Sequence, residues 1–402
     1  MRTMAWPMEP DEVMRVLRAI QFRYFKWDIF HRGDTSIMPD ALVLSPQEHQ
    51  MLVDTAQSVW AALREVEDAV RKDVELLEAV AVPETLRQAI VEQRPHNPRV
   101  TRCDFHLTEK GRWVISEFND DVPSGFGEAV GLAQELPRQF SDRFQGLRFA
   151  GDLQGAIVDS LSEWKSIGFI HATGYSEDLQ HVALVEEWLR QAGHDTAIGS
   201  PANMHVEEGQ AFVFDSPVDA IFRYYPGEWL AELPNVGDWT EAAQFLPVMN
   251  PLSALASQSK RFYAVWNEHD IELSQATRSL LEKYLPPSVY LTSLTRREVL
   301  KNPKRWVLKG SFGRMGKTVR IGPLMPKPKW EKAVREAFDA PQIVAAQKRF
   351  DTAPLWTSKG MGYATVGVYL VDGQFAGYFS RIDKGPLIHY DSFHVPTLVE
   401  IP

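Results

Sequence analysis

Acidic, basic and amide side chains alternate with apolar ones over residues 100–129, and this alternation predicts a β-hairpin with one polar face. In the first arm the polar face carries Arg102, Asp104 and His106. In the second arm it carries Glu117 and Asn119, while Val114, Ser116 and Phe118 lie on the face that we expect to join a core.

A turn centred on Lys110-Gly111 would place Asp104 opposite Glu117 and Arg102 opposite Asn119. Facing residues have Cβ atoms roughly 5 Å apart, so the two carboxylates would repel each other. A hard divalent cation would offset this repulsion, because Mg²⁺ accepts carboxylate and amide oxygens alongside waters and substrate phosphates. Two alternatives stay open: an ordinary solvent-facing hairpin, and a register shifted by one residue.

The length of 402 residues is enough for two or three domains. The content of 44% hydrophobic residues is that of a globular protein with sizeable cores. A formal charge of −10 argues against a nucleic-acid-binding protein. Cys103 is the only cysteine, which excludes an intrachain disulfide and a thiolate zinc site. The chain lacks a secretory signal and an apolar run of about 18 residues. We therefore expect a cytoplasmic protein that binds neither nucleic acid nor membranes.

A long helix is predicted from Ser45, because Ser45-Pro46 and Glu48 form the pattern of a capping box with proline at the first helical position. Apolar residues then recur at threes and fours to about Val82, before Pro83. An aromatic-rich helix in residues 10–30 is expected to pack against the main body. A dimeric coiled coil is the alternative for the long helix, and the oligomeric state stays open.

Residues 166–200 have the pattern strand, helix, strand, which is typical of a doubly wound α/β unit. Such units bind ligands at the carboxyl ends of their strands, here near residues 171–174 and 198–201. His171 at that place is more typical of a structural residue than of a catalyst.

Residues 305–309 predict a strand that ends in Lys309, and a glycine-rich loop follows over residues 310–317. Glycines let backbone N–H groups approach phosphates, and the lysine adds a point charge. A Walker A loop is the alternative, but it needs glycine where Ser311 stands, and it must open a helix. Residues 318–323 alternate like a strand, so we expect strand-loop-strand.

Three motifs resemble those of the glutathionylspermidine synthase family, a circularly permuted branch of the ATP-grasp ligases. They are R-x-D (Arg102, Asp104), E-x-N (Glu117, Asn119) and D-x-P-S (Asp121, Pro123, Ser124). In ordinary ATP-grasp enzymes the lysine and glycine loop precede E-x-N, whereas here Glu117 precedes Lys309. The resemblance extends from the aromatic helix to the C-terminus, and we expect no counterpart of the cysteine amidase that bifunctional members carry.

This resemblance implies an α/β (α+β) fold, a circularly permuted ATP-grasp with a doubly wound α/β subdomain and long N-terminal helices. Three parts are expected: residues 1–160 with the N-terminal helices and metal-binding hairpin, 161–245 as the α/β subdomain, and 246–402 with the ATP-binding lysine, glycine-rich lid and C-terminal sheet. The implied activity is an ATP- and Mg²⁺-dependent carboxylate-amine ligase that works through an acyl phosphate. Its acid would be a peptide and its nucleophile a polyamine or other amine. A kinase and a silent nucleotide-binding protein are the alternatives.

The resemblance also implies roles for individual residues. Asp104, Glu117 and Asn119 would hold two Mg²⁺ ions, and Arg102 would stabilise the acyl phosphate. Substrate would contact Ser124 and Glu228. The expected ATP-binding residues are Lys260, Lys309, Gly313, Arg314, Gly316, Gln347, Lys348 and Arg381, with Lys348 as a substitute for a family lysine that has no clear match.

Overall fold

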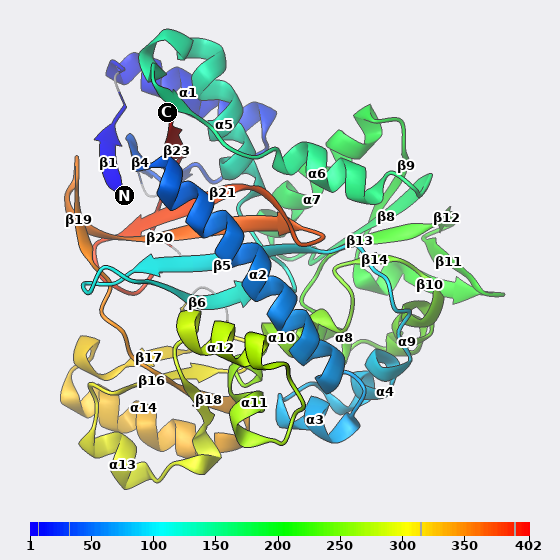
Figure 1. Cartoon of the computed structure of the whole chain (residues 1–402). Coiled ribbons are helices and arrows are strands. Elements are labelled where there is room, and N and C mark those ends of the chain that lie inside the picture. The colour runs from blue at the N-terminus through cyan, green and yellow to red at the C-terminus, as the bar shows by residue number, and fades with distance from the viewer. Residues whose placement is uncertain (7, 32, 314–315, 390) are drawn as a thin grey trace.

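The polar hairpin lies at one edge of a six-stranded antiparallel sheet in the computed structural model, which describes residues 1–6, 8–31, 33–313, 316–389 and 391–402 (Figure 1). In order, the strands are β22 (Phe393–Val395), β21 (Gln374–Asp383), β20 (Gly360–Val371), β5 (Val100–Leu107) and β6 (Trp113–Asn119), and β19 (Pro354–Thr357) pairs with β20. Because β5 pairs with β20, with Asp104 opposite Gly367, the hairpin is completed by residues from the far end of the chain.

The hairpin has the predicted register, with Arg102 opposite Asn119 and Asp104 opposite Glu117. Gly111 has a φ of 72°, the left-handed conformation that the turn requires. The expected face of Ser116 was wrong, because the register shifts after Asp104 and Phe105 pairs with Ile115. This bulge leaves Ser116 without a partner in the ladder and turns its side chain toward the polar face.

Helix α2 (Pro46–Val70) runs across one face of this sheet (Figure 1). Its capping box is confirmed, since the Glu48 amide donates to Ser45 Oγ at 3.2 Å and the Ser45 amide donates to the Glu48 carboxylate at 3.0 Å. The predicted single helix is divided, however, because Asp73 accepts the Glu75 amide at 2.8 Å and begins α3 (Val74–Ala79). The apolar stripe of α2 is buried within the chain, which is the packing that we expected in place of a coiled-coil seam.

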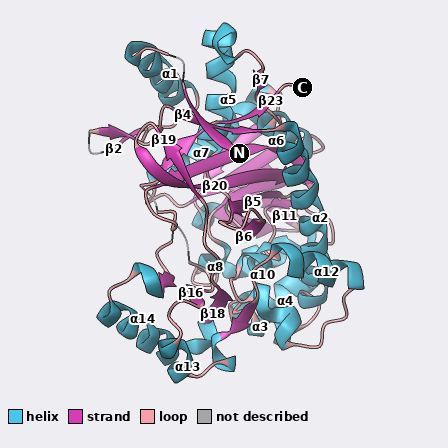
Figure 2. Cartoon of the chain, turned by 60° about the vertical axis from the view of Figure 1, so that its left-hand side comes forward, coloured by secondary structure: helices cyan, strands magenta, loops and turns pink. Residues whose placement is uncertain are grey.

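A second sheet joins the two ends of the chain: β1 (Arg2–Ala5), β4 (Asp40–Leu44), β23 (Thr397–Glu400) and β7 (Leu147–Arg148). Helices α1 (Pro10–Arg23) and α5 (Phe126–Phe140) pack against each other beside it (Figure 2). The aromatic segment packs only in part, because Tyr24 is buried whereas Phe22 is 72% exposed.

The predicted α/β unit is confirmed as a parallel sheet with the order β14 (Val248–Met249), β13 (Ala220–Tyr224), β8 (Ser166–His171), β9 (Asp195–Gly199). Its helices are α6 (Leu153–Leu161) and α7 (Ser176–Gln191). A small antiparallel sheet extends it: β10 (Met204–Glu207), β11 (Gln210–Val213) and β12 (Ser216–Val218). His171 ends β8 and is buried, as a structural residue would be.

The glycine-rich segment belongs to a third antiparallel sheet with the order β15 (Ser288–Tyr290), β18 (Val344–Lys348), β16 (Trp306–Gly310), β17 (Val319–Ile321). The loop joins β16 to the antiparallel strand β17, so the strand-loop-strand prediction is confirmed and the Walker A alternative is wrong. Helices α13 (Arg296–Lys301) and α14 (Lys327–Asp339) contact each other beside this sheet, and together with it they form a separate core.

Shorter elements complete the described part of the chain: β2 (Phe30–His31), β3 (Asp34–Thr35), α4 (Glu84–Glu92), α8 (Gly227–Leu230), α9 (Val236–Phe245), α10 (Ala254–Gln258), α11 (Val265–Glu268) and α12 (Gln275–Tyr284). Within the described ranges, every helix is too short or too polar to cross a lipid bilayer. The division of the chain at residues 160 and 245 stays a prediction.

Candidate active site

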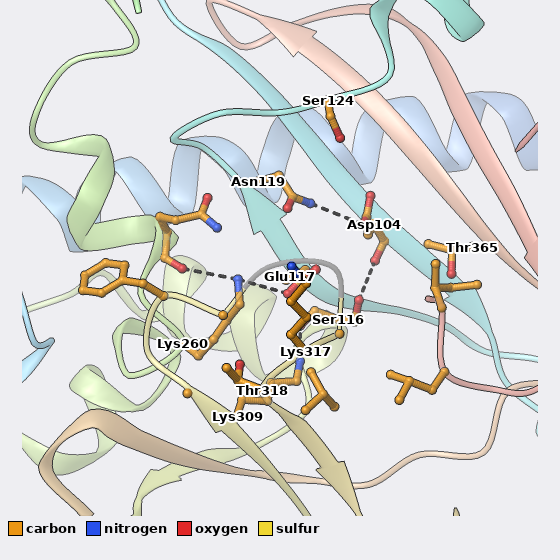
Figure 3. Close-up of a pocket in the computed structure, with 18 of the residues that line it drawn as sticks. Asp104, Ser116, Glu117, Asn119, Ser124, Lys260, Lys309, Lys317, Thr318 and Thr365 are labelled. Carbon is orange, nitrogen blue, oxygen red and sulfur yellow. Dashed lines mark hydrogen bonds and ion pairs between the residues drawn. The ribbon is translucent and has the colours of Figure 1, made fainter. Parts of the chain in front are cut away.

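A cavity of about 490 Å³ opens where the hairpin, the glycine-rich loop and the parallel sheet meet (Figure 3). The hairpin contributes its predicted polar face together with Ser116 from the bulge. The site therefore gathers residues from β5, β6, β16, β18 and β21, which are distant in sequence.

The carboxylate of Asp104 is the centre of the polar contacts on the hairpin. Arg102 donates to it from Nε at 2.8 Å and from the guanidinium end at 3.2 Å, and Arg381 donates at 2.7 Å. The amide of Asn119 donates to the same carboxylate at 3.3 Å, as Figure 3 shows. Arg102 also donates to the carbonyl oxygen of Ser124 at 2.6 Å, which fixes the turn before α5.

Electrostatics keep both facing carboxylates ionised. Burial raises the pKa of Asp104, but the guanidinium groups of Arg102 and Arg381 outweigh burial and hold that pKa well below its ordinary value. Burial likewise raises the pKa of Glu117, but Lys260, 3.0 Å from its carboxylate, and then Lys309 lower it.

The donor set of this face fits Mg²⁺. Asp104 and Glu117 supply carboxylate oxygens on adjacent strands, and Asn119 supplies an amide. Among the described residues, no group of three His, Cys, Asp or Glu side chains converges as a metal cage would require. Two carboxylates and one amide leave coordination positions for waters and substrate phosphates, which is how Mg²⁺ is usually held at nucleotide sites.

Six of the eight expected ATP-binding residues line the cavity. Lys309, on β16, donates to the Ser116 carbonyl oxygen at 3.2 Å, and burial lowers the pKa of Lys309 to about 8. Lys260 is buried, and its backbone amide donates to the Ser311 carbonyl at 2.9 Å, which joins the segment after α10 to the glycine-rich loop. Gly313, Gly316, Gln347 and Arg381 also line the cavity.

The structure does not bring Lys348 to the cavity. Side chains alternate along β18, so Gln347 lines the cavity while Lys348 is exposed on the other side. Arg349, at the following position, does line it. Arg314 lies outside the described residues.

Several cavity residues were not predicted as site residues. His106 was placed on the polar face but given no role, and it contacts Ser116 Oγ at 3.0 Å. Burial lowers the pKa of His106 to about 4, so its imidazole is neutral at pH 7. Gln258 and Lys317 also line the cavity. The bulge that turns Ser116 inward has no sequence signal, whereas Lys317 was visible as the last residue of the loop.

One wall of the cavity is acidic and aromatic. Ser124 and Glu228, the expected substrate residues, both line it. Beside them lie Asp178 from α7, exposed Tyr175 and partly exposed Trp229, with the two ring centroids 6.2 Å apart. The cavity lining thus carries cationic and anionic side chains.

Comparison with known proteins gives a family and a fold. A model of the family described as glutathionylspermidine synthase preATP-grasp matches residues 11–400. No curated protein matches the chain. A glutathione synthetase-like effector from Globodera pallida, solved in its apo form, is similar with a TM-score of 0.65 and 12% identity, over 98% of this chain and 99% of that one. A putative gamma-glutamylcysteine synthetase from Methylobacillus flagellatus KT has a TM-score of 0.45 and 12% identity, over 83% and 88% of the two chains, a likeness too weak to carry an argument.

Proposed function

We propose, from the premise that this chain belongs to the glutathionylspermidine synthase family of ATP-dependent ligases and has their α/β fold, that it joins a carboxylic acid to an amine. The acid would be activated as an acyl phosphate by ATP. The proposed residues are Arg102 at the reacting group, Asp104, Glu117 and Asn119 at Mg²⁺, and Lys260, Lys309 and Arg381 at the triphosphate.

The balance of charge around the facing carboxylates Asp104 and Glu117 supports this proposal most strongly. Four cationic side chains (Arg102, Lys260, Lys309 and Arg381) lie around only two facing carboxylates. Such an excess of positive charge suits a highly charged anion, and the facing carboxylates suit the metal that accompanies ATP. A plain solvent-facing hairpin would not bury these groups.

The reaction divides into two displacements. First, a carboxylate oxygen of the acid forms a bond to the γ-phosphorus of ATP, and the bond to the bridging oxygen breaks, so ADP leaves. Next, the amine nitrogen bonds to the acyl carbon, the carbon–oxygen bond to phosphate breaks, and the amine loses a proton. Bound Mg²⁺ would neutralise charge on the transferring phosphoryl group.

The protein's own residues would orient these partners. Arg102 is held on two sides, by Asp104 and by the Ser124 carbonyl, so its guanidinium needs little rearrangement to contact an acyl phosphate. Lys309 and Lys260 would contact the phosphates of ATP, and the glycines at 313 and 316 would let the backbone approach them. The acidic and aromatic wall would receive an amine that carries further positive charge, as a polyamine does.

Release of ADP tests this proposal. Purified protein with Mg²⁺ and ATP is screened against peptides, including glutathione, and small carboxylic acids, each with and without spermidine, other polyamines and amino acids. A ligase releases ADP only when acid and amine are both present, and mass spectrometry then detects the amide. ADP release with the acid alone would indicate a kinase. ATP binding by calorimetry without turnover on any pair would contradict the ligase proposal and favour a silent nucleotide-binding protein.

A further inference from the structure

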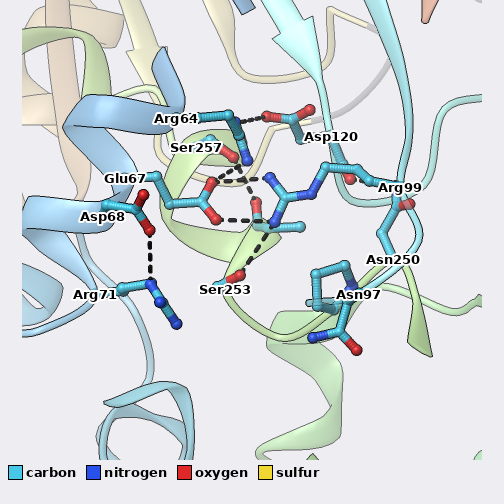
Figure 4. Close-up of polar contacts among 12 residues, drawn as sticks. Arg64, Glu67, Asp68, Arg71, Asn97, Arg99, Asp120, Asn250, Ser253 and Ser257 are labelled. Atoms are coloured by element: carbon cyan, nitrogen blue, oxygen red, sulfur yellow. Dashed lines mark hydrogen bonds and ion pairs between the residues drawn. The ribbon is translucent and has the colours of Figure 1, made fainter. Parts of the chain in front are cut away.

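Two consecutive buried carboxylates follow the metal-binding hairpin and point to different parts of the protein. Asp120 accepts from Arg64 of α2 at 2.8 Å and from Thr101 at 2.5 Å (Figure 4). Asp121 instead accepts from Arg223 of β13 at 2.7 Å and from the backbone amide of Gly227 at 3.0 Å. The Asp120 carboxylate fixes the end of the hairpin to α2 and to β5, and the Asp121 carboxylate fixes it to the α/β unit.

The partners of Asp121 lead directly to the acidic and aromatic wall of the cavity. Arg223 is fully buried and also donates to the backbone carbonyls of Asn250, at 2.9 Å, and of Tyr225. Gly227 begins α8, and the next two residues, Glu228 and Trp229, line the cavity. Asp121 itself does not line it.

Gly227 packs closely against Leu255 and Asp121. A Cβ atom at residue 227 would lie 2.9 Å from Leu255 Cγ and 3.1 Å from Asp121 Oδ1. A side chain at residue 227 would therefore have to displace Leu255 or move the backbone amide away from this carboxylate. Gly227, the Asp121 carboxylate and the Arg223 guanidinium together form one rigid set of contacts, called the joint below.

We propose that Asp121 is a positioning residue that sets the distance between the acyl-phosphate centre and the wall that carries Glu228 and Trp229. It stands two residues after Asn119, so the same short segment carries a metal ligand and the joint to the wall. A change at Asp121 therefore displaces the substrate that rests on this wall and leaves the nucleotide in place. This inference rests on the proposed function, and it assigns to Asp121 the positioning of the wall that binds the substrate.

Asp121→Asn is the variant of choice. Asparagine has the shape of aspartate and keeps one acceptor, but it loses the charge that Arg223 requires. Asp120→Asn is the matched control, because its carboxylate is adjacent and equally buried but pairs with Arg64. Circular dichroism checks folding. Where Asp121→Asn does not fold, the double variant Asp121→Leu with Arg223→Met replaces it, since removal of both charges avoids an unpaired buried ion.

Hydrogen exchange tests the joint without any need for turnover. In Asp121→Asn the amides of residues 225 and 227–231 are expected to exchange about tenfold faster, which is the effect of losing one hydrogen bond to a charged group. Asp120→Asn is expected to leave that peptide protected. Equal protection in the wild type and in Asp121→Asn overturns the proposal.

Kinetics test the specificity role with the acid and amine that the ADP screen identifies. Asp121→Asn is expected to raise the KM of the substrate on the wall by about tenfold and to leave the KM of ATP within about twofold. A loss of kcat alone, or an equal rise in the KM of ATP, would mean that Asp121 has only a structural role. If the wild type releases no ADP with any pair, the proposed function fails, whereas the exchange experiment still decides whether Asp121 holds the wall.

Discussion

The charge on Lys309 is expected to lower the free energy of unfolding, and replacement of Lys309 by methionine should show by how much. The residue is only 8% exposed. Burial lowers its pKa from 10.5 to about 8, with Lys260 acting in the same direction and Glu117 and Asp104 opposing. At pH 7 the lysine is therefore charged in a place where its charge is disfavoured.

The size of the effect follows from the pKa difference. Each pKa unit corresponds to about 1.4 kcal/mol, so the charge on Lys309 lowers the free energy of unfolding by about 3 kcal/mol at neutral pH. Between about pH 8 and pH 10.5 the unfolded chain binds one proton more than the native chain, so wild-type stability rises with pH there. Lys309→Met should be more stable than wild type below pH 8, and the difference should shrink toward pH 10.5.

Urea unfolding of both proteins at pH 7 and pH 10 measures this difference, with Lys348→Met as the control at an exposed lysine. Calorimetry with Mg²⁺ and ATP measures the function of the charge, and Lys309→Met is expected to lose most ATP affinity while Lys348→Met keeps it. A Lys309→Met protein that is less stable at pH 7, or equally stabilised at both pH values, would refute the reasoning about burial. Retained ATP affinity would refute the role at the phosphates.

Four further results are expected. Glu117→Ala should abolish turnover and keep the circular dichroism spectrum of the wild type, whereas Glu109→Ala in the exposed turn should change neither; near-normal turnover of Glu117→Ala would contradict the metal assignment. In steady-state assays, Arg102→Lys should reduce kcat by a larger factor than the factor by which it changes the KM of ATP. The reason is that lysine lacks the planar group that bonds both Asp104 oxygens. Ser45→Ala should lower the free energy of unfolding by about 1 kcal/mol in urea, since the cap of α2 is lost. Gly125→Ala should reduce thermal stability by several degrees, because φ is 107° and a Cβ would lie 2.4 Å from the Phe379 ring.

Short-range signals in the sequence predicted much of the fold. The capping box at Ser45 is formed by residues close together in the sequence, and it is present as expected. The hairpin register followed from a single glycine turn and the alternation of side chains. Such features depend on neighbours within a few residues, so they can be predicted from the sequence alone.

The remaining features of the fold and the site depend on contacts that local sequence patterns do not predict. Ser116 faces the cavity because of a bulge, and the break between α2 and α3 follows from the Asp73 cap inside a continuous apolar stripe. Lys348 pointed away because the register of β18 against β16 decides which side faces the cavity. Tyr175 reaches the site only through the arrangement of the parallel sheet, which residue spacing cannot give.

The pairing of β5 with β20 has a consequence for biosynthesis. Residues 100–107 leave the ribosome long before residues 366–371, so the hairpin has no neighbour on that side while most of the chain is being made. Contacts of such large sequence separation form late, because loop closure must be complete before they stabilise anything. Arg381, which contacts Asp104, arrives later still. Under the proposed function, a nascent chain would therefore lack the complete cationic set around Asp104 until residue 381 has left the ribosome.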